Sequence, residues 1–169
     1  RAVDTTVARV DGAGLVTAVA DGAVGIIASE GTFADTAHVV VRQSIAEIRL
    51  TPTSAGFKAK GETGVFTATA FDAGGTPVHS VSTFTWTTSN ALVATVASDG
   101  TVTAVGDGEA TITAAAGGVQ ATAAVTVGIE VARIEVAPAT HTFVSEGETA
   151  TLTATAFDAG GSPVAAVTT

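Results

Sequence analysis

The sequence predicts an all-β protein built from repeated sandwich domains, and three observations support this prediction. Residues 1–83 align with residues 87–169 without a gap, and about 37 of the 83 aligned pairs are identical. Self-similarity at a fixed spacing, here 86 residues, is the signature of a repeat protein. Short segments alternate apolar residues with threonine, which is the period of a half-buried strand. Glycine, proline and aspartate interrupt these segments at short intervals and no helical period occurs, which is typical of a β-sandwich.

The period also divides the chain, because its length of 169 residues is three short of two periods. We predict one complete domain over 45–128, the C-terminal half of a repeat over 1–44 and the N-terminal half of another over 129–169. The three positions that the two halves lack together correspond to residues 84–86, the centre of a predicted strand. A domain of about 85 residues buries a modest core and folds without disulfides, and the chain has no cysteine.

The complete repeat is expected to contain seven strands. The first strand ends before Pro52, which suits an edge strand because proline cannot donate to a sheet ladder. The sequence Asp-Ala-Gly-Gly at 72–75 predicts a turn, because aspartate accepts from its own downstream backbone and glycine adopts positive φ. Further turns are expected at 98–100, 106–108 and 117–118. The expected strands are 45–50, 65–71, 83–88, 93–96, 101–105, 110–114 and 119–127.

Alternation along the expected strands identifies the core. In the strand 65–71 the residues at 66, 68 and 70 share one face, and the threonines between them share the other. Phe84 and Trp86 share a face of the next strand and supply two large rings. The predicted domain core consists of Phe66, Ala68, Phe84, Trp86, Val96, Val102, Ile112 and Val125.

The order of these segments resembles a known family. The strings EIRLTP, GETGVFTATAFDAGGTPV, FTWTTSN and ALVATVASDGTVTAVGDGEATITA follow one another and precede a last valine-rich strand. This order is similar to the bacterial immunoglobulin-like (Ig-like) repeat of group 2, over the whole middle repeat and over each terminal half. The resemblance implies an Ig-like sandwich that occurs in tandem arrays on bacterial adhesins, other envelope proteins and phage structural proteins. It implies no enzyme, because the family has no catalytic motif.

The repeat tests whether histidine or serine could carry chemistry, because a site built into the repeat should recur. His38, His79 and His141 all align with alanine, so a repeated histidine-based metal or acid–base site is excluded. No serine lies in a G-x-S-x-G turn. We therefore expect no catalytic residue and no enzymatic activity.

Three acidic positions do recur: Asp21 with Asp107, Glu62 with Glu148, and Asp72 with Asp158. Calcium at a domain junction is one interpretation, because this cation takes several carboxylate and carbonyl oxygens. The other interpretation is turn capping by the aspartates and an exposed strand start at the glutamate. The acids are scattered along the chain without a D-x-D-x-D cluster, which favours capping. We expect no cofactor and no required metal.

Composition limits the partners of the chain. The net charge of −9 without a basic stripe argues against nucleic acid. No apolar run approaches the length of a membrane-spanning helix. Composition fixes no compartment, and the extracellular location at a bacterial surface is what the family resemblance implies.

These features predict a structural role in a stiff rod or filament. Neither half repeat covers its apolar face alone, so each is expected to be completed head-to-tail by another copy of the chain or by a continuing tandem array. The residues expected to share this inter-subunit core are Val7, Val10, Val16, Ile26, Val39, Val41, Ile134, Val136, Phe143, Leu152, Ala154 and Ala156.

The alternative function is an adhesin module that binds a protein or glycan ligand. Such a module would concentrate differences between repeats in one loop cluster, whereas here the differences spread along the strands and the 72–75 turn is unchanged. Exposed aromatic rings would favour glycan binding, but Phe84 and Trp86 lie on the inward alternation of their strand.

Overall fold

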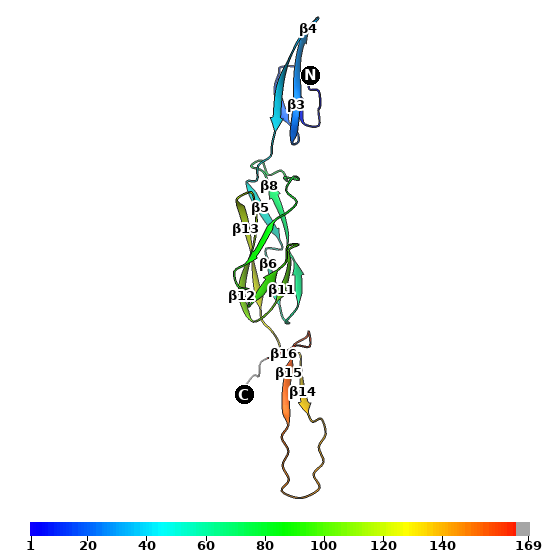
Figure 1. Cartoon of the computed structure of the whole chain (residues 1–169), viewed down its shortest axis with the longest axis vertical. Helices are drawn as coiled ribbons and strands as arrows, with labels where there is room; N and C mark the ends of the chain where they lie inside the picture. Colours follow the sequence, from blue (N-terminus) through cyan, green and yellow to red (C-terminus); the bar gives the residue numbers. More distant parts are fainter. Residues whose placement is uncertain (165–169) are drawn as a thin grey trace. The chain divides into compact units, whose positions relative to one another are not determined.

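The computed structural model describes residues 1–164 and shows an all-β protein, as the sequence predicts (Figure 1). Residues 165–169, the end of the predicted half repeat 129–169, lie outside the described residues. The described part of the chain contains sixteen strands and no helix. It divides into two units: residues 1–46 with 71–78, and residues 47–70 with the remainder from 79.

The first unit contains two antiparallel strand pairs. Strand β1 (Ala8–Val10) pairs with β2 (Val16–Ala18), and β3 (Gly22–Glu30) forms a long hairpin with β4 (Phe33–Val41), drawn in blue in Figure 1. Ala8 and Val24 are buried in this unit, while most of β4 is exposed. The apolar surface of these strands is therefore only partly covered.

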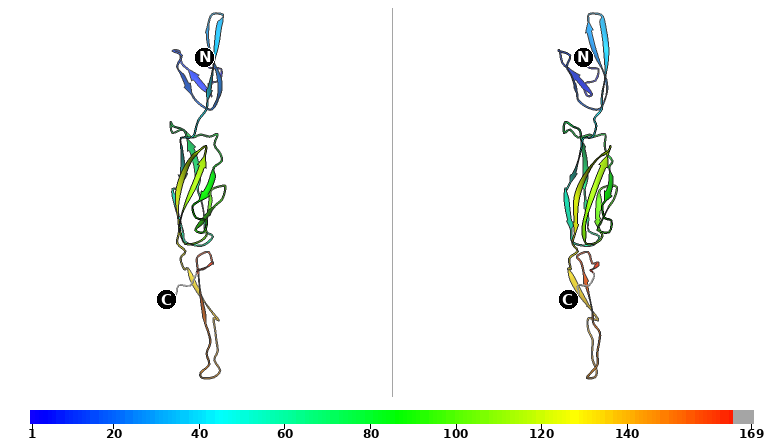
Figure 2. Two further views of the ribbon diagram at one scale, coloured as in Figure 1. Left: turned by 60° about the vertical axis from the view of Figure 1, so that its left-hand side comes forward. Right: turned by 90° about the vertical axis from the view of Figure 1, so that its left-hand side faces the viewer.

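The second unit contains the complete repeat. Its largest sheet has the order β6-β13-β12-β9, in which β13 pairs with β6 in parallel and with β12 antiparallel. A three-stranded sheet has the order β10-β11-β7, and β5 pairs with β8. Figure 2 shows these strands packed face to face. The strands are β5 (Glu47–Thr51), β6 (Ser54–Phe57), β7 (Thr63–Val65), β8 (Thr67–Phe71), β9 (Thr85–Thr88), β10 (Ala94–Val96), β11 (Thr101–Ala104), β12 (Gly108–Ala116) and β13 (Val119–Val127).

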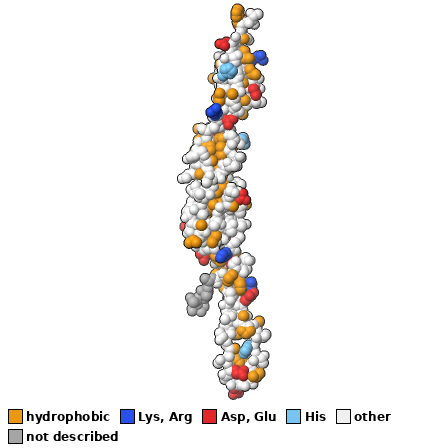
Figure 3. All heavy atoms as spheres, viewed as in Figure 1, with side chains coloured by type: hydrophobic (Ala, Val, Ile, Leu, Met, Phe, Trp, Pro, Cys, Tyr) orange, Lys and Arg blue, Asp and Glu red, His pale blue; other side chains and the backbone are white. Residues whose placement is uncertain are grey.

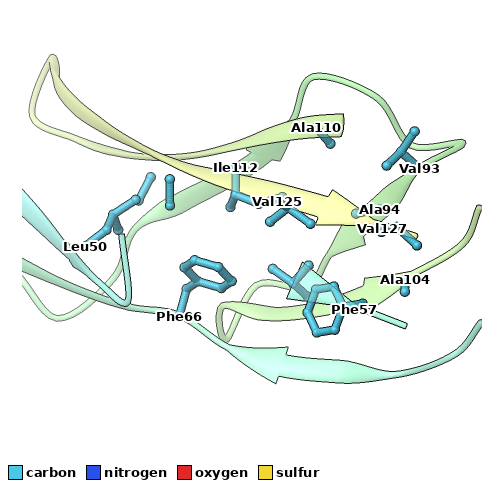
Figure 4. Close-up of a cluster of buried hydrophobic side chains, with 13 residues drawn as sticks. Leu50, Phe57, Phe66, Val93, Ala94, Ala104, Ala110, Ile112, Val125 and Val127 are labelled. Carbon is cyan, nitrogen blue, oxygen red and sulfur yellow. The ribbon is translucent and has the colours of Figure 1, made fainter. Parts of the chain in front are cut away.

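The core of this repeat lies between the sheets. Figure 4 shows Phe57 and Phe66 pointing toward Val125 and Ile112 of the long strands β12 and β13. Phe66, Val102, Ile112 and Val125 of the expected core are almost completely buried. The other expected core residues are half-buried and pack against the cluster: Ala68, Phe84, Trp86 and Val96.

The strand count differs from the expected seven, because residues 47–127 contain nine strand segments. The expected strand 65–71 is interrupted at Phe66, whose N–H donates to the Gly100 carbonyl at 2.9 Å. Strand β6 was not expected, because Ser-Ala-Gly-Phe has no alternating pattern. It forms through backbone pairing with β13, which leaves little trace in side-chain chemistry.

Strand registers recur at the sequence period. The pair Ala8↔Ala18 of β1 and β2 has its counterpart in Ala94↔Ala104 of β10 and β11, 86 residues on. The β3–β4 hairpin has the same register as the β12–β13 hairpin after the same shift. The cis peptide bonds before Pro52 and Pro138 are also 86 residues apart.

The segment after the complete repeat forms one small sheet. Its strands are β14 (Arg133–Ala137), β15 (Thr153–Phe157) and β16 (Pro163–Val164). Residues 138–152 contain no strand, although the counterparts of 140–143 and 149–151 form β6 and β7 in the complete repeat. Figure 3 shows apolar side chains at the surface of this segment.

Candidate functional site at the repeat junction

The junction after the complete repeat begins with the loop 58–62, which carboxylate and backbone groups fix in place. Glu62 Oε2 accepts from the N–H groups of Lys58 at 2.7 Å and Ala59 at 3.2 Å. The Gly61 N–H donates to the Ala104 carbonyl, and the Ala104 N–H donates to the Glu62 carbonyl, both at 2.9 Å. The loop is therefore a rigid extension of the domain.

The connection to the next segment is also held by hydrogen bonds. The Gly128 N–H donates to the Phe57 carbonyl at 3.0 Å, and the Ile129 N–H donates to Asp107 Oδ1 at 2.6 Å. The Glu130 N–H then donates to the Lys58 carbonyl at 2.9 Å. Three consecutive backbone donors are thus satisfied by the preceding domain, which is unlike a flexible linker.

Asp158, the first residue of the second Asp-Ala-Gly-Gly turn, connects this turn to the loop 58–62. Its Oδ1 accepts from the Ser162 N–H at 2.7 Å within the turn, and its Oδ2 accepts from the Lys60 N–H at 2.8 Å. The residue is 2% exposed, so both bonds are shielded from water. One carboxylate therefore shapes the turn and binds the preceding domain.

The electrostatics of Asp158 follow from this environment. Burial alone raises the pKa of its carboxyl group, but the backbone N–H groups of Lys60, Ser162, Gly160 and Gly161 outweigh burial and hold the pKa below its usual value. The ionised form is therefore the one that the junction stabilises.

Gly160 explains why the turn contains two glycines. Gly75 and Gly161 adopt φ near +80°, which favours glycine, whereas Gly74 and Gly160 do not have positive φ. A Cβ at Gly160 would lie 3.2 Å from the Lys60 carbonyl oxygen. The first glycine of the turn thus permits close approach of the preceding domain.

The corresponding turn in the first unit has the same internal structure but a different outer contact. Asp72 Oδ1 accepts from the N–H groups of Gly74 at 2.9 Å and Thr76 at 2.8 Å. Its Oδ2 accepts from the Gln43 side-chain Nε2 at 3.0 Å. The Thr76 N–H and then the Gln43 amide hold the pKa of Asp72 below its usual value.

A hollow opens beside this turn. It lies between three short segments of the first unit, which are 18–20, 41–44 and 72–76. Gln43 and Asp72 both line it and are joined by the side-chain hydrogen bond, and the Gln43 N–H donates to Asp21 Oδ1 at 2.5 Å.

In the structure the recurring acidic side chains accept hydrogen bonds from backbone N–H groups. Glu148 Oε2 accepts from the Val144 N–H at 3.0 Å, as Glu62 accepts from Lys58. Asp21 and Asp107 accept from backbone N–H groups 22 residues on. Among residues 1–164 no group of three or more histidine, cysteine, aspartate or glutamate side chains is arranged for a metal ion. Asp72 and Asp158 cap their own turns, whereas Asp21 and Asp107 bind more distant backbone and the two glutamates bind N–H groups four residues earlier.

The residues expected to form an inter-subunit core lie in two different environments. Those of the first unit are half-buried except Val16, which is exposed. In the second unit Ala156 is half-buried. The other five residues are exposed: Ile134, Val136, Phe143, Leu152 and Ala154. The two sets belong to different units of the described chain.

Sequence analysis missed the contact partners at the junction. Lys60 binds Asp158 through its backbone N–H, which no side-chain pattern encodes. One signal was available, since the first glycine of the turn recurs at 74 and 160 although neither residue has the positive φ that favours glycine.

Comparison with known families identifies the complete repeat. Residues 44–127 match the model of the bacterial Ig-like domain (group 2). The chain carries a bacterial Ig-like domain of group 2. The family resemblance and the all-β, Ig-like fold predicted from the sequence are thereby confirmed.

The Ig-like chain is also similar to several larger proteins. It is 34% identical over 120 residues to "Ice-binding protein 1" of Shewanella frigidimarina (strain NCIMB 400), covering 68% of this chain and 13% of that protein. The S-layer protein rSbsC aligns with the whole chain over 24% of its own length, at 24% identity and a TM-score of 0.49. Domains 5–6 of SbsC align over 73% of this chain and 67% of theirs, at 26% identity and a TM-score of 0.45. The chain thus spans a small part of the curated relative.

None of the residues that the structure describes lies in a helix long and apolar enough to cross a membrane.

Proposed function

We propose that this chain is a non-catalytic structural segment of a stiff rod or filament at a bacterial surface. Residues 1–44 and 129–169 are halves of Ig-like domains, completed head-to-tail by neighbouring copies or by the continuing chain. Membership of the Ig-like family supports a surface location. The net charge of −9 keeps such a rod soluble through self-repulsion.

One observation carries the proposal: apolar residues of the terminal segments are exposed where their counterparts in the complete domain are buried. Phe143 is 51% exposed, while Phe57 is 5% exposed. Leu152 is 57% exposed, while the equivalent Phe66 is 1% exposed. Burying one such side chain contributes about 1.5–3 kcal/mol. The exposed residues with buried counterparts are Val16, Ile134, Val136, Phe143 and Leu152.

Backbone pairing supports the same conclusion. Strand β6 pairs with β13, and β7 pairs with β11, so both strands depend on the back half of the repeat. The counterparts of β13 and β11 are residues 33–41 and 15–18, which lie in the N-terminal segment. A second copy therefore offers the partners that residues 140–143 and 149–151 lack. Because this contact joins different surfaces, it extends into an open filament instead of a closed dimer.

Association in solution tests this function. Sedimentation equilibrium of the chain should give an average mass above that of the monomer that rises with protein concentration. The variant Leu152→Ser should weaken association at least tenfold, because it removes a side chain of the shared core. Leu92→Ser is the matched control, since Leu92 is 81% exposed on the complete domain and should leave association unchanged. A chain that stays monomeric throughout the concentration range contradicts completion by neighbouring copies.

Ligand binding by the complete domain is the second candidate function. A shallow hollow between the 82–84 segment and the turn at 98–99 exposes part of the Phe84 and Trp86 rings. Aromatic rings beside hydroxyl groups suit a glycan. Trp86 is the only tryptophan of the chain, so its fluorescence reports on this hollow directly. A saturable fluorescence change with an oligosaccharide, lost in Thr83→Ala, would favour this function over the purely structural one.

A further inference from the structure

The hollow of the first unit occupies a place that is filled at the other junction. Shifted by 86 residues, its three walls 18–20, 41–44 and 72–76 become 104–106, 127–130 and 158–162. At that second junction the loop 58–62 contacts all three of these segments. The hollow is thus equivalent to the space that this loop takes.

The contacts of the filled junction are specific. The Gly61 N–H donates to the Ala104 carbonyl at 2.9 Å, and the Lys60 N–H donates to Asp158 Oδ2 at 2.8 Å. The Lys58 carbonyl accepts from the Glu130 N–H at 2.9 Å. Each wall therefore forms at least one hydrogen bond with the backbone of the loop, and Ala104 forms a second one by donating to the Glu62 carbonyl.

We propose that the hollow is the docking site for the loop 144–148 of a second copy of this chain. This inference rests on the proposed completion of half domains and gives it a residue-level contact. The Glu146 N–H donates to Asp72 Oδ2, and the Gly147 N–H donates to the Ala18 carbonyl. The Val144 carbonyl accepts from the Ser44 N–H of the receiving copy.

The loop 144–148 already has the shape that docking requires. Glu148 Oε2 accepts from the Val144 N–H at 3.0 Å, as Glu62 accepts from the Lys58 N–H at 2.7 Å in the docked loop. Gly147 has φ of 83°, against 79° for Gly61. All five residues of the loop are exposed, so their backbone groups are accessible. Little ordering is lost on docking, which favours binding.

Charge also favours this occupant. Arg42 lines the hollow where the filled junction has Gly128, and Glu146 lies in the loop where the docked loop has Lys60. The filled junction has the ion pair between Lys58 and Glu130 at 2.9 Å, whose counterparts 144 and 44 are uncharged, so in the second-copy contact the opposite charges are instead Arg42 of the hollow and Glu146 of the loop. The Gln43 side chain, which holds Asp72 Oδ2 in the single chain, gives up this bond to the incoming backbone N–H.

Introduced cysteines test the docking, because the natural chain contains none. At the filled junction a Cβ on Gly160 would lie 3.7 Å from the Ala59 Cβ, which matches the geometry of a disulfide. Ala59→Cys with Gly160→Cys in one chain is the positive control and should close an intramolecular disulfide. The equivalent pair in two copies is Gly74→Cys and Ser145→Cys.

A mixture of Gly74→Cys and Ser145→Cys chains should form the mixed disulfide at least tenfold faster than a mixture of Thr32→Cys and Ser145→Cys chains. Thr32 is exposed in the turn between β3 and β4, away from the hollow. Equal rates in the two mixtures, with the positive control closing, would overturn the proposal. If the chains still associate by sedimentation in that case, the completion of half domains stands and only the docking loop is wrong. If they do not associate, both fail.

A second variant tests the acceptor without introducing a thiol. Asp72→Asn keeps an oxygen for its own turn but places an amide group toward the incoming Glu146 N–H, and should weaken association about tenfold. Asp11→Asn is the matched control, because Asp11 caps a turn through Oδ1 in the same unit and does not line the hollow. Equal association of the two variants and the parent chain would overturn the role of Asp72.

Discussion

Truncation of Phe66 tests the described core sharply, because the equivalent residue 86 positions on, Leu152, is exposed and serves as the control. Phe66 is 1% exposed and lies at the centre of the cluster between the two sheets. Phe66→Ala removes a buried ring and leaves a cavity, which costs about 3–5 kcal/mol of unfolding free energy. A domain of about 80 residues has a total stability of roughly 4–12 kcal/mol. The loss is therefore a large fraction of the total stability of the domain.

Urea denaturation followed by tryptophan fluorescence measures this change. Trp86 is the only tryptophan and packs against the cluster, so its signal reports on the complete domain. With a slope of about 1.5 kcal/mol per molar urea, the transition midpoint should fall by roughly 2–3 M. Leu152→Ala changes the equivalent position 86 residues on, where the side chain is 57% exposed, and should leave this transition in place.

Two results would refute the reasoning. A loss below about 1 kcal/mol in Phe66→Ala would mean that Phe66 is not a core residue. An equal loss in Leu152→Ala would mean that the segment after the complete domain shares its core within one chain.

Three further predictions follow from single contacts. Gly100→Ala should lower the unfolding free energy of the complete domain by about 3 kcal/mol, because a Cβ would collide with the Phe66 carbonyl oxygen. The equivalent change Gly14→Ala should cost about 1 kcal/mol, because Gly14 has a φ of 85° but open space around it. Similar losses in the two variants, measured by urea titration and by hydrogen exchange, would contradict the collision. The pKa of Asp158 is lowered in the folded chain, so its stabilisation of the junction is present above the unfolded-state pKa of about 3.9 and is lost as pH falls through the folded pKa. The amide resonance of Lys60 should therefore stay constant from neutral pH to about 4 and move below it in the parent chain but not in Asp158→Asn, and movement above pH 5 would contradict this sign. Addition of EDTA should change the melting temperature by no more than about two degrees, because the recurring carboxylates accept from backbone donors, and a larger drop would show that they hold a calcium ion.

Much of the fold could be predicted from the sequence because its strands are encoded by side-chain alternation. The strand at 119–127 has the predicted bounds, and Phe66 and Ala70 are buried while Thr67 and Thr69 are exposed. Strand β6 could not be predicted, because the pairing of 54–57 with β13 uses backbone groups. Trp86 is less buried than the alternation suggests, since β9 is the edge strand of its sheet.

The junction could be predicted only in part. The recurrence of Asp72 and Asp158 pointed to a shared role, and turn capping by Oδ1 follows from the residue type. The second role of Asp158, as acceptor for the Lys60 N–H, depends on a tertiary contact between segments 98 residues apart. Local sequence carries no record of such a contact except the glycine that permits it.

Hydrogen exchange in the segment 138–152 tests the completion of half domains most directly. In a single chain this segment contains no strand, so its amides should exchange rapidly in dilute solution. When copies complete each other, residues 140–143 and 149–151 form the counterparts of β6 and β7, and their amides should become protected as protein concentration rises. The amides of β12 and β13 should be protected at every concentration and serve as the internal reference. Association of the chain without new protection at 140–143 and 149–151 would contradict the account.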